Sequence, residues 1–316
     1  MEEGGHELHV MLKERENTKI LMDQFGLDHQ EFGRTYTGRF SKGYGVFYND
    51  VSLLRKIGRN NIDVTASIGG LYSVHAGKML DAVTIDFMDT EGARFTNMLT
   101  FPFADIIATP DCYSSPVPDD RHIPYPGYHE LAYLHPNRYQ PDESILDRLD
   151  VGRREYIVVR FSSLDASHQR GERALNVKEK LQLIKYLERH GRVYVNSESR
   201  LPPPLKKHRM PVTDDKFLDL LAFSKLYVGE GATAASEAGV LGVPWVYISK
   251  KGRCYLDDQQ KRYSLGKQCK DLKETKEAVG ELLQGGHDFK RARKRLLRDK
   301  IDVTGWMIEL FEDLDI

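Results

Sequence analysis

The fold class is decided by the segment Tyr227-Val-Gly-Glu-Gly-Ala-Thr-Ala-Ala-Ser-Glu-Ala-Gly-Val-Leu-Gly-Val-Pro244, which joins an apolar run to a helical pattern. Gly229 and Gly231 permit a tight turn at the end of the apolar run. The small residues that follow predict a helix, which Gly242 and Pro244 bring to an end. A strand, a glycine-rich turn and a helix in this order are typical of a βαβ unit in a parallel sheet.

The same alternation of short apolar runs and longer helical patterns continues on both sides of this segment. It predicts strands over residues 7–12, 63–68, 82–86, 105–109, 156–161, 192–196, 225–228 and 245–248. The helical patterns cover residues 19–25, 44–59, 72–80, 93–101, 177–190, 214–224, 233–241, 272–283, 288–299 and 303–314. This order predicts an α/β protein built on parallel sheets.

A proline-rich segment separates two runs of this alternation. Seven of the thirteen prolines lie in residues 110–141, where the pattern stops. We therefore predict two doubly wound Rossmann-like domains, residues 1–140 and 141–301. Residues 1–10 resemble a helix end, a turn and a second strand, whereas a doubly wound domain begins with a strand in mid-sheet. The first strand of the N-terminal domain is therefore expected to be missing from this sequence, and an unusually built domain is the alternative.

Composition excludes several classes of protein. Forty-six Lys and Arg against forty-seven Asp and Glu leave a formal net charge of −1, which gives no reason to expect nucleic-acid binding. The three cysteines show no CxxC spacing and the histidines show no metal-ligand spacing, so we expect neither a disulfide framework nor a metal site. The mean hydropathy of −0.51 and the lack of a signal-peptide pattern predict a cytoplasmic protein.

One helical pattern, residues 289–299, carries six basic side chains on one side. A solvated face is the default interpretation, and weak contact with an anionic membrane surface is the alternative. The oligomeric state is left open by the sequence. The basic residues are Lys290, Arg291, Arg293, Lys294, Arg295 and Arg298.

The glycine-rich turn is the strongest candidate binding site. The start of the helix after it offers free N–H groups, which favour a phosphate. Thr233 and Glu237 lie four residues apart and share one helix face, so the hydroxyl suits a phosphate and the carboxylate suits ribose hydroxyls. The alternative is a plain strand–turn–helix joint, in which the glycines serve packing alone. The candidate residues are Gly229, Gly231, Ala232, Thr233 and Glu237.

A second candidate site follows the strand at residues 156–161. Arg160 ends this strand and can bind phosphate with two parallel hydrogen bonds. The polar loop after it contains Ser163, Asp165 and His168, and His168 can donate to a phosphate or move a proton. Loops of this kind lie at the carboxyl edge of a parallel sheet, where ligands bind. The alternative is a solvated loop.

A third candidate site follows the strand at residues 82–86. Asp86, Asp89 and Glu91 lie close together in the sequence, and neighbouring carboxylates raise one another's pKa, as a general base or acid requires. The alternative is capping of the next helix by Asp89 or Thr90, with Glu91 in its first turn. Further candidate contacts with a substrate are Arg94, Asn97 and, in the proline-rich segment, His129. For His129, packing within the proline-rich segment is the favoured alternative.

In this order the motifs resemble a family of mainly archaeal proteins of unassigned function. That family is related in fold to the glycosyltransferase B superfamily and to the non-hydrolysing UDP-N-acetylglucosamine 2-epimerases. The resemblance rests on Gly-His-Glu at residues 5–7, Asp-Thr-Glu at 89–91 and Tyr-Pro-Gly-Tyr-His-Glu at 125–130. It continues with Arg-Phe at residues 160–161, Asp-Ala-Ser-His at 165–168 and Gly-Glu-Gly-Ala-Thr at 229–233.

The resemblance implies two Rossmann-like domains that face a cleft, with the terminal helix, residues 302–316, packed back on the first domain. The C-terminal domain would hold a nucleoside-diphosphate sugar, with UDP as the expected carrier and no cofactor. The glycine-rich turn would take the diphosphate and Glu237 the ribose. Asp89 or Glu91 would activate an acceptor hydroxyl, and His168 would stabilise the leaving diphosphate. A 2-epimerase-like isomerase and a non-catalytic nucleotide-sugar-binding protein are the alternatives.

Overall fold

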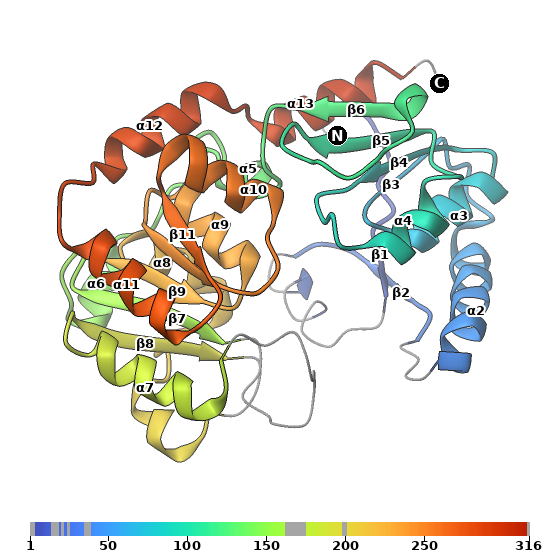
Figure 1. The fold of residues 1–316 in the computed structure, drawn as a ribbon. Helices are drawn as coiled ribbons and strands as arrows, with labels where there is room; N and C mark the ends of the chain where they lie inside the picture. Colours follow the sequence, from blue (N-terminus) through green and yellow to red (C-terminus); the bar gives the residue numbers. More distant parts are fainter. Residues whose placement is uncertain are drawn as a thin grey trace. The chain divides into compact units, whose positions relative to one another are not determined.

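The computed structural model describes residues 4–13, 19, 22–23, 26–34, 39–161, 175–197 and 201–314. Contacts within the chain divide it into two compact units (Figure 1). Unit 1 consists of Met1–Tyr125 together with Met307–Ile316, and unit 2 is Pro126–Trp306. The boundary thus follows Tyr125, whereas the sequence placed it at residue 140.

Unit 1 contains two parallel sheets. The larger has the strand order β3-β4-β5-β6, and the smaller joins β1 to β2. The strands are β1 (Met11–Lys13), β2 (Gln30–Phe32), β3 (Val64–Ile68), β4 (Val83–Phe87), β5 (Ile106–Pro110) and β6 (His122–Tyr125). The helices are α2 (Arg39–Ile57), α3 (Leu71–Met79), α4 (Arg94–Thr100) and a 3₁₀ turn at Asp119–Arg121.

The core of unit 1 lies on the faces of β4 and β5, whose apolar side chains are almost entirely buried. Val74 of α3, Met88, Phe101, Ala104 and Ile107 form one buried cluster. A second cluster joins Phe32 to Leu53 and Ile57 of α2 and to Ala76 of α3. Burial of these side chains is what fixes α2 and α3 to the strands.

Unit 2 is one five-stranded parallel sheet with the order β11-β10-β9-β7-β8. Its strands are β7 (Tyr156–Phe161), β8 (Arg192–Ser197), β9 (Leu226–Gly229), β10 (Trp245–Ile248) and β11 (Gly266–Cys269). The α-helices are α5 (Leu131–Leu134), α6 (Ser144–Leu149), α7 (Val177–Leu187), α8 (Phe217–Ala222), α9 (Ala232–Val240), α10 (Cys254–Asp258), α11 (Leu272–Leu283) and α12 (Phe289–Asp299). Shorter helical segments cover Pro203–His208, Asp214–Lys216 and Gln259–Tyr263.

The first strand of unit 2, β7, lies inside the sheet. It pairs with β8 on one side and with β9 on the other, and five of its six residues are buried. A continuous apolar run is what a strand covered on both faces requires. The sequence predicted this strand with its observed bounds.

The last helix, α13 (Val303–Glu312), is shared between the two units. Residues 303–306 belong to unit 2, and the remainder of the helix belongs to unit 1. The ring of Phe311 lies 6.3 Å from the ring of Phe87 on β4, measured between centroids. The C-terminal residues therefore pack on the sheet of unit 1.

Several predicted elements differ from the structure. Of the strand predicted at residues 7–12, only residues 11 and 12 lie in a ladder, as part of β1. The helix predicted at residues 214–224 is a 3₁₀ turn followed by α8. Three strands, β2, β6 and β11, were not predicted. The strand β6 lies inside the proline-rich segment, which is possible because Pro124 stands on an edge strand that needs no further N–H partner.

Candidate functional site

The site in unit 2 is built where β9 ends and α9 begins. Gly229 closes β9, and Gly231 is the N-cap residue of α9. A Cβ atom on Gly229 would lie 2.4 Å from the carbonyl oxygen of Arg160 and 2.7 Å from Oη of Tyr227. Since these distances are too short for any side chain, close packing of β9 against β7 explains Gly229 without a ligand.

The start of α9 has no side-chain cap among the described residues. Its first N–H groups carry the positive end of the helix dipole. Gly231 and Ala232 are half-buried and Thr233 is exposed. A phosphate group fits such an end, because it accepts several backbone hydrogen bonds at once.

Glu237 lies one turn further along α9 and is 9% exposed. Its Oε1 accepts a hydrogen bond from Oη of Tyr133, at 2.8 Å. Burial raises the pKa of this carboxyl, while the bond from Tyr133 and the charge of Arg160 act in the opposite direction. The carboxyl is therefore held in a defined orientation among polar partners, although the sequence did not indicate Tyr133.

Arg160 stands beside the turn at the end of β7. A Cβ atom on Gly231 would lie 3.6 Å from its Cδ, and its guanidinium carbon is 5.6 Å from the centroid of the Phe217 ring. Tyr227 donates from Oη to the carbonyl oxygen of Gly231 at 3.1 Å. The structure therefore brings Arg160 together with the turn and Glu237, as the sequence predicted for the carboxyl edge of the sheet.

A buried ion pair supports the turn, and sequence reasoning missed it. Nζ of Lys180 on α7 lies 2.8 Å from Oε2 of Glu230, and their side chains are 1% and 7% exposed. The backbone N–H of Glu230 also donates to the carbonyl oxygen of Arg160, at 2.9 Å. A charged residue between two glycines is the sequence signal that could have pointed to this pair.

The other residues predicted for this site do not all lie beside the turn. Ser163, Asp165 and His168 lie outside the described residues. His129 is half-buried and directly precedes Glu130, the N-cap residue of α5, the helix that also carries Tyr133. The segment of His129 thus belongs to unit 2 and reaches α9 through the bond between Tyr133 and Glu237.

In unit 1 the acidic residues at the end of β4 take separate partners. Asp89 accepts a hydrogen bond from the hydroxyl of Thr90 at 2.8 Å. Glu91 accepts one from the backbone N–H of Ser114 at 3.0 Å and a second from the Ser114 hydroxyl. The alternative of helix capping is wrong, because α4 begins after Ala93 and no side chain caps it.

Asn97 and Arg94 both lie on α4 but differ in environment. Asn97 is 8% exposed and donates from Nδ2 to Oη of Tyr113 at 3.1 Å, whereas Arg94 is exposed. Asn97 therefore already has a structural contact. Arg94 is the more accessible of the two predicted substrate contacts.

Asp86 is the most deeply buried acidic residue at this end of the sheet. Its side chain is fully buried, and its Oδ1 accepts the backbone N–H of Gly70, the N-cap residue of α3, at 3.2 Å. Burial raises the pKa of this carboxyl to about 6. The position was evident in the sequence, but its burial depends on neighbouring strands and was not.

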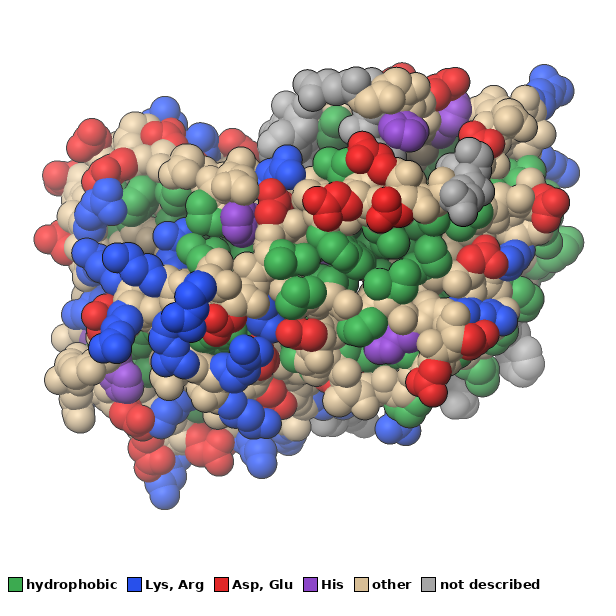
Figure 2. Space-filling model, turned by 90° about the horizontal axis from the view of Figure 1, so that it is seen from above, with side chains coloured by type: hydrophobic (Ala, Val, Ile, Leu, Met, Phe, Trp, Pro, Cys, Tyr) green, Lys and Arg blue, Asp and Glu red, His purple; other side chains and the backbone are tan. Residues whose placement is uncertain are grey.

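The basic side chains of α12 gather on one exposed surface (Figure 2). Arg293 is the exception, because it is half-buried; its Nε donates to the carbonyl oxygen of Val240 at the end of α9, at 2.9 Å. None of the helices in the described ranges is both long and apolar enough to cross a membrane. Across the same residues, no group of three His, Cys, Asp or Glu side chains is arranged to hold a metal ion.

No protein-family model and no curated protein matches this sequence. Solved structures do match the fold. The UDP-GlcNAc 2-epimerase of Methanocaldococcus jannaschii has a TM-score of 0.65 at 12% identity, over 96% of this chain and 91% of that chain. The spinosyn forosaminyltransferase SpnP has a TM-score of 0.62 at 12% identity, over 99% and 93%. The MnaA protein of S. aureus, solved with UDP, has a TM-score of 0.61 at 9% identity, over 93% and 91%.

These similarities confirm the predicted fold class. The chain consists of two Rossmann-like α/β units of the type found in glycosyltransferase B enzymes and UDP-GlcNAc 2-epimerases.

Proposed function

We propose that this chain is a nucleotide-sugar-dependent glycosyltransferase. Unit 2 binds the diphosphate at the start of α9 and the ribose at Glu237. The observation that carries the proposal is the uncapped start of α9 with Arg160 and a buried carboxylate beside it. UDP is the carrier we favour, because UDP or UDP-GlcNAc is present in structures of the same fold.

The charges of the site suit the departure of a diphosphate. In the transfer, an acceptor hydroxyl oxygen bonds to the anomeric carbon while the bond from that carbon to the diphosphate oxygen breaks. Arg160 and the N–H groups of α9 would stabilise the negative charge of the leaving group, so the proposal assigns no metal to this step. Ser163 and His168 keep their predicted contacts with the diphosphate, and Asp165 stays a predicted contact of the substrate.

The proton of the acceptor hydroxyl would pass to a carboxylate of unit 1. Asp89 and Glu91 keep this predicted role, with Arg94 and Asn97 as predicted contacts of the sugar or acceptor. His129 is the predicted sugar contact from unit 2. Asp86 is fully buried and is assigned no contact with the substrate.

The test is calorimetry of the 316-residue chain with UDP, UDP-GlcNAc and, as a control without phosphate, uridine. We expect UDP to bind and uridine to bind at least about tenfold more weakly, since the phosphates contribute charge-assisted hydrogen bonds. Glu237→Gln retains the shape that Tyr133 contacts and should weaken UDP about tenfold. Glu277→Gln, on the exposed side of α11, is the matched control and should have no effect. No UDP binding at millimolar concentration would contradict the proposal.

A 2-epimerase-like isomerase is the second candidate, favoured by the similarity to the Methanocaldococcus jannaschii epimerase. Here Asp89 or Glu91 would exchange the proton on C2 of the sugar while the nucleotide is eliminated and re-added. Deuterium incorporation at C2 from heavy water, without an acceptor, would select this activity over transfer. Binding of UDP-GlcNAc with neither exchange nor transfer would indicate a non-catalytic nucleotide-sugar-binding protein.

Contact of α12 with an anionic membrane surface stays a prediction. Vesicles of phosphatidylserine and phosphatidylcholine should retain the chain at low ionic strength more than pure phosphatidylcholine vesicles do. Lys290→Glu combined with Lys294→Glu should remove the difference, because both side chains are exposed.

A further inference from the structure

The helix α2 of unit 1 carries a row of apolar side chains on its outward face. Four residues at helical spacing form this row: Tyr44, Phe47, Tyr48 and Val51. The side chain of Tyr44 is 63% exposed and that of Phe47 is 67% exposed. The rings of Tyr44 and Tyr48 lie 6.3 Å apart between centroids. Large aromatic side chains are therefore presented to solvent side by side.

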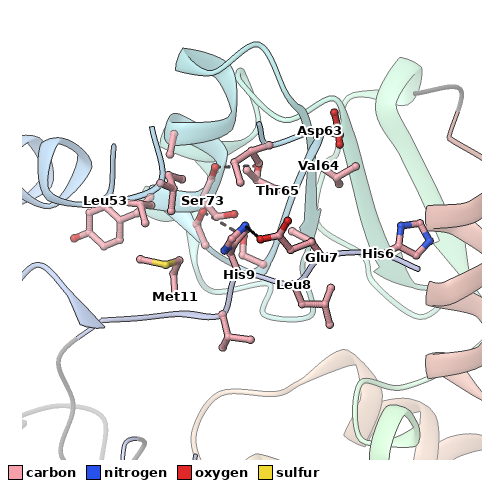
Figure 3. A pocket seen from close by; sticks show the side chains of 18 of the residues that line it. His6, Glu7, Leu8, His9, Met11, Leu53, Asp63, Val64, Thr65 and Ser73 are labelled. Carbon is pink, nitrogen blue, oxygen red and sulfur yellow. Dashed lines mark hydrogen bonds and ion pairs between the residues drawn. The ribbon is translucent and has the colours of Figure 1, made fainter. Parts of the chain in front are cut away.

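The opposite face of α2 contacts the core of unit 1. Leu53 and Ile57 are 3% and 5% exposed, and they belong to one buried cluster with Phe32 and Ala76. Leu53 also lines the cavity of about 690 Å³ next to β1 and β3 (Figure 3). At about 100° per residue, Tyr44 stands about 180° around the helix from Leu53. The outward row is therefore not the surface through which α2 packs.

The outward row continues into a basic end. Arg55 stands one helical turn beyond the last residue of the row, and Lys56 and Arg59 follow within one more turn. All three side chains are exposed. The only acidic residue of α2 is Asp50, which is 7% exposed and lies 3.0 Å from Nδ1 of His75. The outward face of α2 is thus aromatic and cationic, without a carboxylate of its own.

A hollow of about 400 Å³ lies along this face of α2. Among the described residues, its lining contains the apolar row toward one end and Arg55 and Lys56 toward the other. An apolar end next to a cationic end suits a ligand that is both apolar and negatively charged, because each part meets a matching environment. A membrane lipid with an anionic headgroup has this chemistry.

A second copy of this chain suits the same face less well. Two copies of α2 would bring together aromatic, aliphatic and basic side chains, and neither would offer an exposed carboxylate to the basic end of the other. A membrane that contains anionic lipid provides both an apolar layer for the aromatic rings and negative charge for the basic end.

We propose that the outward face of α2 is a docking surface for a membrane that contains anionic lipid. Tyr44 and Phe47 enter the boundary between headgroups and acyl chains, and Arg55 and Lys56 contact the headgroup phosphates. From Tyr44 to Arg55 the helix rises about 17 Å, which suits a helix that lies along the surface of a membrane. The proposal does not rest on the nucleotide site of unit 2.

The experiment measures sedimentation of the 316-residue chain with vesicles. Every chain tested carries Lys290→Glu and Lys294→Glu, so that α12 does not contribute to binding. We expect mixed vesicles of phosphatidylserine and phosphatidylcholine to retain the chain at low ionic strength. Pure phosphatidylcholine vesicles should retain it at least about fivefold less, because they offer no net charge to the basic end. No retention by the mixed vesicles, or equal retention by both kinds, would overturn the proposal.

Two exposed phenylalanines of unit 1 provide a matched comparison. Phe47→Ser should weaken binding to the mixed vesicles at least about fivefold, because an aromatic ring no longer enters the apolar layer. Phe95→Ser removes a ring of α4 that is 69% exposed, and it should leave binding unchanged. Both variants should fold, since neither ring belongs to a buried cluster of unit 1. Equal losses in the two variants, or no loss in Phe47→Ser, would contradict the assignment to α2.

Quenching of tryptophan fluorescence measures the lipid contact itself. Phe47→Trp and Phe95→Trp each add one indole to the two tryptophans of the chain. Phosphatidylcholine brominated on its acyl chains, mixed with phosphatidylserine, should quench the added fluorescence of Phe47→Trp and not that of Phe95→Trp. Equal quenching of both would overturn the proposal. So would self-association without lipid that Phe47→Ser abolishes, because the surface would then bind a second copy of this chain.

Discussion

The two units arrange their parallel strands differently. In unit 2 the sheet is continuous, and its first strand, β7, is fixed by ladders on both sides. In unit 1 the described strands belong to two separate sheets, and a cavity lies next to β1 and β3. The comparison teaches that, among the described residues, two Rossmann-like units of one chain differ in how far their parallel strands join into a single sheet.

The glycine-containing turns between a strand and a helix also differ between the two units. In unit 1, the joint between β3 and α3 is occupied internally, because the Asp86 carboxylate accepts the N–H of Gly70. In unit 2, Arg160 lies beside the joint between β9 and α9. Among the described residues no side chain caps α3 or α9, so the two joints differ in the charged group that lies next to the start of the helix.

The largest expected effect concerns the central strand. Val158→Asp places a charge in the fully buried middle of β7 and should destabilise unit 2 by about 4 kcal/mol or more. Ala66→Asp, on the open edge of β3, should cost less than about 1 kcal/mol. Both tryptophans lie in unit 2, so tryptophan fluorescence follows its unfolding, and hydrogen exchange of the β4 amides follows the unfolding of unit 1. Similar losses for the two variants would remove the distinction between a filled and an open position.

The second prediction concerns the ion pair behind the turn of unit 2. Lys180→Met leaves the buried Glu230 carboxylate without its ammonium partner and should cost about 3–5 kcal/mol in urea unfolding. Adding Glu230→Gln should recover much of this loss. The control is Lys267→Met, which breaks a solvent-exposed pair with Glu281 and should leave the free energy of unfolding nearly unchanged.

The third prediction concerns Asp86 in unit 1. Burial raises its pKa from 3.8 to about 6, so the folded state binds the proton more tightly than the unfolded state. This contribution is complete below pH 4 and is lost as the pH rises toward 6, by about 3 kcal/mol in total. Asp86→Asn should remove that pH dependence of the free energy of unfolding. An unchanged slope between pH 4 and pH 6 would contradict it.

The smallest expected effect is the stabilisation of one unit, and not of the other, by a ligand. UDP at ten times its Kd should stabilise unit 2 by about 1.4 kcal/mol, if it binds at α9. The unfolding of unit 1, followed by exchange of the β4 amides, should show no matching increase. Stabilisation of unit 1 alone would place the nucleotide elsewhere.

The sequence predicted the fold well where side-chain pattern and burial agree. β7, β10 and α11 have the predicted bounds, because their apolar runs are long enough to define them. The polar edge strand β11, with the sequence Gly-Lys-Gln-Cys, carries no such pattern and was missed. Its place is set by packing, since a Cβ atom on Gly266 would lie 2.1 Å from the Trp245 side chain.

The candidate site was predictable only in part for a related reason. The glycine turn and Glu237 occur in one segment, so their proximity follows from helix geometry alone. The contact of Tyr133 with Glu237 spans 104 positions of the sequence, and the pair of Lys180 with Glu230 spans 50. Contacts of this kind depend on which helix covers which strand end, and local patterns do not contain that information.

The division of α13 between the units has a consequence for biosynthesis. Most of unit 1 is synthesised before unit 2, yet Phe311, which packs beside Phe87, is synthesised after it. All of unit 2 is complete before Met307 is reached. At about 5–20 residues per second, the ribosome needs roughly 10–40 seconds to travel from Tyr125 to Phe311. The N-terminal unit must therefore wait for its last helix, and the unit that starts second is the first to be able to fold completely.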